Sequence, residues 1–513
     1  MYMDPSSLMV VLGMVGVILI LIFDKMRPGF TLFVGALFFA VTGVISTDEL
    51  LDGFANKSVA TIAILFLIGE GVRQSGSLSY VMRMMLPRRK RYVGWLMAQV
   101  LPFIAMISSV MNNTAVVIIF APIFKRWSER LGISPTKVLI PLSYATILGG
   151  MCTLIGTSTN MVINGMMTES GFRSLSMFEI GQVGGVIAVV GLIYICVLGN
   201  RLLPNGASTE SIDLGDGAER VEVIIASRFP GLNSRSKEFD FQRHYGAKIM
   251  AIKQRGMYIR STIEEHIFEE GDTLVLEADS AFTKTWRGSS AFFVVSSNSE
   301  DETPRIPMTN RKWLGVSLLI FLLCGSLLGE IVQRGTGASF DILLWISVIM
   351  VIMAVTKLFP AKRYTKFISW DILVAIASAF AISRAIANSG LSDLIAEWIV
   401  SITLSWGAIG AMAVLYLVTM LLTELITNNA AVAISFPVAV ALSNRLGVDP
   451  MPMFIAISIA ASASFSTPIG YQTNLIVQGI AGYRFADYLK IGLGLNLIAF
   501  VVSMLLIPRI WSF

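Results

Sequence analysis

Charge, histidine and cysteine are all scarce in this sequence. Only 14% of its 513 residues are charged, whereas a soluble globular chain carries roughly 25%. This deficit excludes an ordinary cytosolic enzyme, a disordered protein and a nucleic-acid binder, and the net charge of +5 is too small to imply a polyanionic partner. Two histidines argue against a histidine metal site. The three cysteines, Cys152, Cys196 and Cys324, offer neither a disulfide framework nor a metal-binding spacing.

Long apolar runs fill most of the chain instead, and apolar residues make up 55% of it. A helix needs about 20 apolar residues to cross a bilayer. The first run, 8–23, has no basic start and no cleavage site, so we expect a retained helix rather than a signal peptide. Further runs lie at 30–45, 58–72, 93–111, 115–124, 138–168 and 180–199, and again at 313–329, 341–358, 370–385, 391–402, 407–423, 430–442, 451–466 and 488–508.

A polar stretch interrupts these runs in the middle of the chain. Its alternating segments 220–227, 247–253, 272–277 and 291–295 predict β-strands. We therefore expect three parts: a first membrane repeat at 1–202, a small α/β insert at 203–310, and a second membrane repeat at 311–513.

The two apolar parts resemble each other. Internal repeats of this kind are usual in secondary transporters. If each Asn-Asn segment is a re-entrant hairpin, each half has five crossings, and this odd number turns the second half upside down. Three blocks match at offsets of 314 to 316 residues. Gln74–Gly76 matches Asn388–Gly390, and Asn112-Asn113 matches Asn428-Asn429. Thr153–Gly156 matches Thr467–Gly470, and Asn160 matches Asn474.

The charges between the runs predict the orientation. Basic residues favour the cytoplasmic side of a membrane. The expected inner loops carry Lys25, Arg27, Arg88–Arg91, Lys125, Arg126, Arg130, Lys137, Lys357, Lys362, Arg363, Lys366, Arg484 and Lys490. The expected outer loops carry Asp48, Glu49, Asp52, Glu169, Glu179, Glu330, Asp393 and Glu397. We therefore expect a multi-pass protein of the inner (plasma) membrane, with both termini outside and the insert in the cytoplasm.

Two pairs of breaks in the apolar runs carry the candidate chemistry. Met111–Thr114 and Thr427–Ala430 each interrupt a long apolar run with paired amides. A helix that starts just after such a pair directs its positive N-terminal end to the same place. The second pair, 149–160 and 462–474, is rich in glycine and hydroxyl side chains, whose oxygens suit a hard monovalent cation such as sodium. Packing kinks and polar helix contacts are the structural alternatives.

These stretches resemble the divalent anion:sodium symporter family, part of the ion-transporter superfamily that includes citrate and arsenite carriers. The resemblance covers roughly 30–200 and 313–510. In that family each hairpin tip reads Ser-Asn-Thr, whereas the tips here read Asn112-Asn113-Thr114 and Asn428-Asn429-Ala430. The resemblance implies an elevator mechanism and a homodimer. The insert, in its stretch 219–277, resembles the C-terminal ligand-binding domain of regulators of potassium conductance (RCK-C), which implies a regulatory ligand whose identity the sequence does not indicate.

The breaks and the resemblance together give the candidate site residues. For substrate they are Asn113, Thr114, Thr157, Asn429, Ala430 and Pro468. For sodium they are Ser108, Asn112, Asn113, Gly156, Thr427, Asn428, Asn429 and Gly470. No cofactor is expected besides the co-transported sodium.

Four charged residues lie within or near apolar runs: Glu70, Arg73, Arg384 and Glu424. Charges inside a membrane are costly and usually functional. Glu70 and Arg73 are three residues apart on one expected helix and could simply pair. Glu424 stands alone before the second tip and is a candidate coupling acid.

The sequence thus predicts an all-α polytopic membrane protein that couples sodium entry to uptake of sulfate or of a di- or tricarboxylate. A proton-coupled or arsenite-type carrier is the alternative within the same class. An ion channel gated by the insert is the alternative from another class. An enzyme is not expected, because no nucleophile–base arrangement and no metal cluster stand out.

Overall fold

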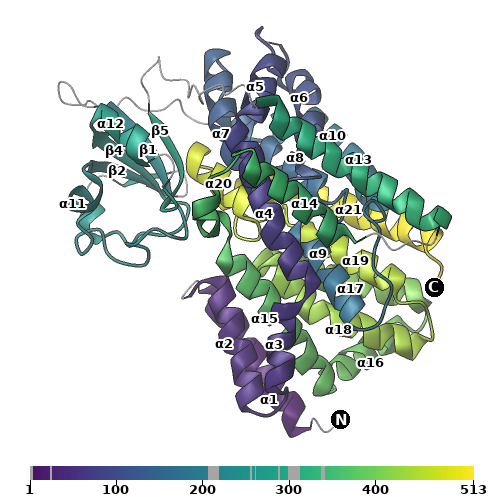
Figure 1. Ribbon diagram of the computed structural model, residues 1–513. Helices are drawn as coiled ribbons and strands as arrows, with labels where there is room; N and C mark the ends of the chain where they lie inside the picture. Colours follow the sequence, from purple (N-terminus) through teal and green to yellow (C-terminus); the bar gives the residue numbers. More distant parts are fainter. Residues whose placement is uncertain are drawn as a thin grey trace.

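The computed structural model describes residues 4–23, 26–89, 91–205, 219–254, 257–259, 262–286, 289–297, 312–336 and 341–513. Helices form most of the molecule, and a small sheet lies to one side of the helical body (Figure 1). The expected inner-loop residues Lys25 and Lys90 lie outside the described residues, as do both connections to the sheet, 206–218 and 298–311.

Most of the helices before the sheet follow the predicted apolar runs, and two short ones, at 47–55 and 77–85, lie between those runs. Most are apolar all round because they are buried in the bundle or face lipid. They are α1 (Pro5–Ile22), α2 (Pro28–Val41), α3 (Thr47–Ala55), α4 (Lys57–Ser75), α5 (Ser77–Met85), α6 (Val93–Ser108), α7 (Asn113–Arg130), η1 (Pro135–Lys137), α8 (Leu139–Gly150), α9 (Ser158–Glu169) and α10 (Gly181–Leu202).

The helices after the sheet repeat this succession of lengths. They are α13 (Lys312–Thr336), α14 (Ile342–Val355), η3 (Ala361–Phe367), α15 (Trp370–Asn388), α16 (Leu391–Thr403), α17 (Gly407–Leu425), α18 (Asn428–Leu446), α19 (Met451–Ser462), α20 (Gln472–Ala481) and α21 (Phe485–Ile510).

The matched glycines of the two halves adopt the same backbone conformation. Gly76 ends α4 at a φ of 69°, and Gly390 follows α15 at a φ of 71°. Both lie in the left-handed region, which glycine enters without steric cost. Each then leads directly into a short helix, α5 or α16.

Within the described residues the sheet has five strands in the order β3-β2-β4-β1-β5, and its pairs are antiparallel. Four strands confirm the predicted segments, and β3 is an additional short strand. The elements are β1 (Glu219–Ile225), α11 (Phe241–Tyr245), β2 (Lys248–Gln254), β3 (Met257–Ile259), η2 (Ile263–Glu265), β4 (Thr273–Ala278), α12 (Ser280–Trp286) and β5 (Phe292–Ser297). Its own hydrophobic cluster includes Phe229, Phe268 and Leu274. We call the described residues 219–297 the insert.

The helices pack in two groups. In the tip-bearing group, α6, α8 and α10 pack on one another, α10 packs on α21, and α17 and α18 pack on α19. In the flanking group, α15 packs on α2 and α3, while α13 and α14 pack on α4. The groups meet where α18 contacts α15 and α16 and where α9 contacts α4. The flanking helices α1, α2, α3 and α15 lie together at one end of the molecule (Figure 1).

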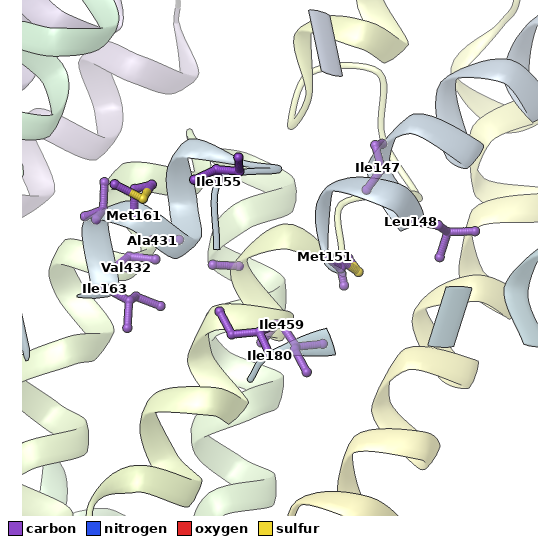
Figure 2. Packing of buried hydrophobic residues seen from close by; sticks show 14 of the residues in the cluster. Ile147, Leu148, Met151, Ile155, Met161, Ile163, Ile180, Ala431, Val432 and Ile459 are labelled. Atoms are coloured by element: carbon purple, nitrogen blue, oxygen red, sulfur yellow. The ribbon is translucent and has the colours of Figure 1, made fainter. Parts of the chain in front are cut away.

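Close packing holds the two halves together inside the tip-bearing group. Figure 2 shows Met161 and Ile163 of α9 beside Ala431 and Val432 of α18. These side chains are fully or almost fully buried. At Gly149 of α8, an added Cβ would come within 2.1 Å of the Ala105 carbonyl oxygen of α6, so only glycine allows this approach.

Seven segments among the described residues are long and apolar enough to cross a membrane: Pro5–Ile22, Thr47–Ser75, Gly181–Leu202, Trp370–Asn388, Gly407–Leu425, Asn428–Leu446 and Phe485–Ile510. Several shorter apolar helices accompany them. One face of α10 exposes Val189, Ile193 and Val197, a pattern suited to lipid. The protein is therefore an all-α polytopic membrane protein with a small sheet.

Candidate functional site

Four helix interruptions lie where the sequence predicts them. In the first half, α6 ends at Ser108 before α7 begins at Asn113, and α8 ends at Gly150 before α9 begins at Ser158. In the second half, the gap between α17 and α18 is only Ile426 to Thr427, and the gap between α19 and α20 spans 463–471. The four interruptions expose backbone groups that helices would otherwise satisfy.

The first tip is held by two local hydrogen bonds. The Ser108 hydroxyl donates to Asn113 Oδ1 at 2.7 Å. Asn112 caps α7, because its Oδ1 accepts from the Thr114 backbone N–H at 2.9 Å. The side chain of Asn113 is thus oriented by a residue five positions earlier, and Asn112 satisfies one of the N–H groups at the start of the helix.

The second tip repeats these bonds one residue away from the expected register. The Thr423 hydroxyl donates to Asn428 Oδ1 at 2.8 Å, and Thr427 caps α18 through the Ala430 N–H. Asn428 therefore corresponds to Asn113, and the predicted match of Asn113 with Asn429 is wrong by one position.

The physical reason for this shift is helix capping. Two consecutive asparagines fit either register in the sequence, but threonine is a favoured N-cap and precedes the pair in the second half. The second tip consequently reads Thr427-Asn428-Asn429, so it keeps a leading hydroxyl residue and a central asparagine.

The stretches 149–160 and 462–474 also share their hydrogen bonds. Asn160 Nδ2 donates to the Thr153 carbonyl at 2.8 Å, and the Gly156 N–H donates to the Thr153 hydroxyl at 3.1 Å. In the second half, Asn474 Nδ2 donates to the Thr467 carbonyl at 3.1 Å, and the Gly470 N–H donates to the Thr467 hydroxyl at 3.3 Å.

Each of these two asparagines is also bound by the opposite half. The Ser458 hydroxyl of α19 donates to Asn160 Oδ1 at 2.8 Å, and the Ser143 hydroxyl of α8 donates to Asn474 Oδ1 at 2.7 Å. All four residues are fully buried. The two interrupted helices are thereby joined by a reciprocal pair of bonds away from water.

A cavity of about 710 Å³ lies where the four interruptions meet. Ten of the predicted site residues line it: Asn112, Asn113, Thr114, Gly156, Thr157, Thr427, Asn428, Asn429, Pro468 and Gly470. Ser108 and Ala430 do not line it and lie buried behind the tips. The cavity therefore brings together residues more than 300 positions apart in the chain.

Many lining residues were not predicted from the sequence, and three of them, Tyr471, Ser158 and Gln472, make polar contacts with predicted site residues. Tyr471 accepts a hydrogen bond from Asn113 Nδ2 at 2.9 Å, and its hydroxyl lies 3.0 Å from the Thr157 hydroxyl. Ser158 donates to Asn429 Oδ1 at 3.4 Å, and Gln472 lies beside Thr114. The repeat offset of 314 already related Thr157 to Tyr471 and would have identified the position.

Glu424 is buried just behind the second tip, with 8% of its surface exposed. Its Oε1 accepts from the Ser466 N–H and from Asn496 Nδ2, both at 2.8 Å, and its Oε2 accepts from the Ser464 hydroxyl at 3.3 Å. No salt bridge to Glu424 occurs within the described residues. A buried carboxylate without a cationic partner is costly unless a proton or a cation neutralises it.

The other charged residues of the apolar runs have partners. Glu70 and Arg73 pair on α4 at 2.6 Å, which confirms the simpler interpretation of these two residues. Arg384 of α15 pairs with Glu169 at the end of α9 at 3.1 Å. This second pair joins the flanking group to the tip-bearing group.

The insert lies at the mouth of the cavity. Lys253 and the turn Glu269–Asp272 line the cavity together with the tips. The Thr273 hydroxyl donates to the Gly479 carbonyl of α20 at 2.7 Å. On the flanking group, Arg228 donates to the Ile368 carbonyl at 3.0 Å. The insert thus contacts both groups of helices.

Charged residues strengthen the contact between the insert and α7. Lys125 of α7 forms a salt bridge with Glu222 of β1 at 2.7 Å. Burial raises the pKa of Glu222, but Lys125 and Arg220 outweigh it and hold that pKa below its ordinary value. Burial, together with the charges of Lys125 and Arg220, lowers the pKa of Lys253 to about 8.

This fold and this cavity define a polytopic membrane transporter whose site is built from interrupted helices. The sequence profile of a family described as citrate transporter (CitMHS) matches residues 18–444 and 425–512, and the chain belongs to that family. This family match identifies the protein as a transporter rather than an enzyme.

Curated relatives agree with this assignment. A candidate sulfur deprivation response regulator of Chlamydomonas reinhardtii is 26% identical, over 92% of this chain and 96% of its own length. An uncharacterized transporter of Synechocystis is 27% identical, over 93% of this chain and 92% of its own length. A protein of Chlamydomonas reinhardtii named probable sodium/sulfate cotransporter 3 is 21% identical, over 90% of this chain and 83% of its own length. These names are consistent with the divalent anion:sodium symporter family expected from the sequence.

Proposed function

We propose that the protein is a sodium-coupled symporter for a small divalent anion, with sulfate as its first candidate substrate. The observation that carries this proposal is the convergence of four interrupted helices, two from each half, on one cavity with matched hydrogen bonds. A relative named as a sodium/sulfate cotransporter supports the choice of ions.

The first sodium ion is proposed to bind at the first tip, among oxygens of Ser108, Asn112, Asn113 and Gly156. The second is proposed to bind at the second tip, among oxygens of Thr427, Asn428, Asn429 and Gly470. The anion then lies between the helix N-termini, near Asn113, Thr114, Thr157, Asn429, Ala430 and Pro468. Positive helix ends and the two bound cations would offset its charge.

The Ala430 assignment concerns only the backbone. Its side chain carries no polar atom, and its N–H is engaged by Thr427 at 3.4 Å. Ala430 is therefore proposed to contribute through the positive end of α18 and not through a side-chain contact.

Transport is proposed to follow an elevator mechanism in an inverted repeat, with each tip belonging to a re-entrant hairpin. The tip-bearing group would slide against the flanking group, and the flanking groups would join two copies in a homodimer. The packing of the helices into these two groups supports this division. The ion pair of Arg384 with Glu169 would have to open during that movement.

Uptake into proteoliposomes tests the proposal. Labelled sulfate, succinate and citrate are offered in turn with an inward sodium gradient, with choline in place of sodium, and with an inward proton gradient. Sodium-dependent accumulation of sulfate or of a carboxylate is expected. Accumulation that follows the proton gradient alone would contradict sodium coupling and would favour the proton-coupled alternative, for which buried Glu424 is the candidate carrier.

Cysteine labelling tests the proposed orientation in the inner (plasma) membrane. After replacement of Cys152, Cys196 and Cys324 by serine, single cysteines are placed at the exposed positions Asp52 and Glu238. A membrane-impermeant maleimide added to whole cells should label position 52 only, because the insert is proposed to be cytoplasmic and both termini external. Labelling of position 238 from outside would overturn this topology.

The insert is proposed to be an RCK-C-like regulatory domain for an unidentified small ligand. Replacement of Asp213–Ser299 by a Gly/Ser linker, whose two end points lie outside the described residues, should keep sodium-dependent uptake. The tips owe none of their local hydrogen bonds to the insert. If the shortened protein inserts, remains monodisperse and binds no substrate, the insert helps to build the site.

A further inference from the structure

Thr157 and Tyr471 occupy matched positions in the two halves. Each occupies the N-cap position of the helix that follows an interruption, with φ and ψ of −138° and 147° at Thr157 and of −136° and 129° at Tyr471. Each follows a glycine and precedes, by three positions, the asparagine that is bound by the opposite half. The backbones are equivalent, so the difference between the two positions is one of side-chain size.

The tyrosine side chain crosses the cavity to the first tip. Its hydroxyl accepts a hydrogen bond from Asn113 Nδ2 at 2.9 Å and lies 3.0 Å from the Thr157 hydroxyl. The amide of Asn113, whose Oδ1 is already bound by Ser108, is therefore turned toward the phenol. The aromatic ring fills part of the space between the two tips, where the anion is proposed to bind.

The backbone before Tyr471 is closely packed. A Cβ added at Gly470 would come within 2.0 Å of Ser464 Oγ and within 2.6 Å of the Thr423 carbonyl oxygen. The chain at Gly470 therefore lies directly against the end of α17. Tyr471 is anchored at its backbone by this contact and at its hydroxyl by the first tip.

We propose that Tyr471 sets the size of the substrate. With the ring in place, the space between the two tips favours a compact tetrahedral dianion such as sulfate over elongated di- and tricarboxylates, although the whole cavity, which extends to the insert, is larger. A pocket discriminates strongly against a larger ligand when a fixed side chain occupies the volume that the ligand needs. The Tyr471 hydroxyl also offers one hydrogen bond to the anion. This inference rests on the proposed function and specifies its substrate class.

Two substitutions separate the size of the side chain from its hydroxyl. Tyr471→Thr places in the second half the residue that the first half carries. It should reduce the preference for sulfate over succinate at least about tenfold, the equivalent of about 1.4 kcal/mol. Tyr471→Phe retains the ring and should keep the preference, while the KM for sulfate rises about 5- to 10-fold from the loss of one hydrogen bond. Tyr194→Phe is the matched control, since that hydroxyl donates to the Ile491 carbonyl at 3.2 Å and does not line the cavity.

A series of competitors on the unmodified protein tests the same idea without substitution. Unlabelled selenate and molybdate, which are tetrahedral, should inhibit uptake of labelled sulfate, whereas succinate and citrate should not. Inhibition by citrate as strong as that by selenate would overturn the inference, as would an unchanged preference in Tyr471→Thr. If the unmodified protein accumulates no anion in a sodium-dependent manner, the proposed function itself fails. If uptake depends on sodium but short and long anions inhibit it equally, the proposed function stands and only the inference about substrate size fails.

Discussion

The two halves of the site share their hydrogen bonds but differ in the side chains that face the cavity. Ser108 and Thr423 each orient the asparagine five positions later, and Asn160 and Asn474 each bind two carbonyls of their own interruption. The shared bonds keep the helix ends in place in both halves. The differing residues are therefore the ones free to serve ion and substrate selection.

The differences fall on the second half. Where the first half has Thr157, the second has Tyr471, and where the first half has Ser109, one residue after the hydroxyl that orients the tip, the second has Glu424. The proposed symporter would need asymmetry of this kind, because two similar cation sites would have to be coupled to one anion. The following predictions test the comparison, from the largest expected effect to the smallest.

Removal of either tip asparagine should have the largest effect. Asn113→Ala and Asn428→Ala should each lower sodium-dependent uptake by about 100-fold or more, because a proposed cation site loses an oxygen and its oriented partner. Uptake in proteoliposomes at several sodium concentrations measures the loss, with size-exclusion chromatography as the check on folding.

The register of the second tip is tested by its neighbour. Asn429→Ala should reduce anion affinity more than sodium affinity, since Asn428 is the residue held by Thr423. If Asn429→Ala instead abolishes sodium dependence and Asn428→Ala leaves it normal, the correspondence of Asn113 with Asn428 is wrong.

Neutralisation of Glu424 should have the next largest effect. Glu424→Gln keeps the size of the side chain and removes its charge in a buried site, where an ionised group is costly without a counter-ion. If Glu424 supports the second cation, sodium affinity should fall about tenfold, because the loss of a residue that supports the ligands of a cation weakens its binding by about that factor. If Glu424 carries a proton, the pH profile of uptake should flatten instead.

A matched carboxylate provides the control for this variant. Glu70→Gln removes one member of the pair with Arg73 on α4, away from the cavity. Its sodium affinity and pH profile should stay normal. A Glu424→Gln protein with the same sodium affinity and pH profile as the unmodified protein would reduce Glu424 to a structural residue.

The reciprocal bonds between the halves should give the smallest and most symmetric effects. Ser143→Ala and Ser458→Ala each leave a buried asparagine oxygen without its donor, which costs about 1–3 kcal/mol. The midpoint temperature of thermal unfolding in detergent should fall equally in the two single variants. It should fall nearly additively in the double variant, because the two serines share no partner. A loss confined to one of them would show that the two halves are not held in equivalent ways.

Much of the fold was predictable because apolar run length and turn chemistry are local signals. The four main strands, most of the long helices and the four interruptions lie where the pattern places them, whereas the short helices α3, α5 and α20 lie between the predicted runs. The register of the second tip was not predictable, since an Asn-Asn pair fits either position until its helix cap is known. Tyr471 was missed because its hydroxyl contacts Asn113 across 358 positions of the chain. No local pattern contains that contact, and only the repeat offset of 314 from Thr157 would have identified the position.

The sequence by itself determined that this protein is a membrane protein, that its two halves repeat, and that polar breaks interrupt its helices at matched positions. The first follows from residue type along single segments, and the other two follow from the comparison of the two halves of the sequence. Only the tertiary structure decided that the breaks meet at a single cavity, that Glu424 is enclosed by Ser464, Ser466 and Asn496, and that the insert lies at the cavity mouth. These arrangements depend on contacts between distant segments, which form because buried polar groups must find partners wherever the packed helices bring them together.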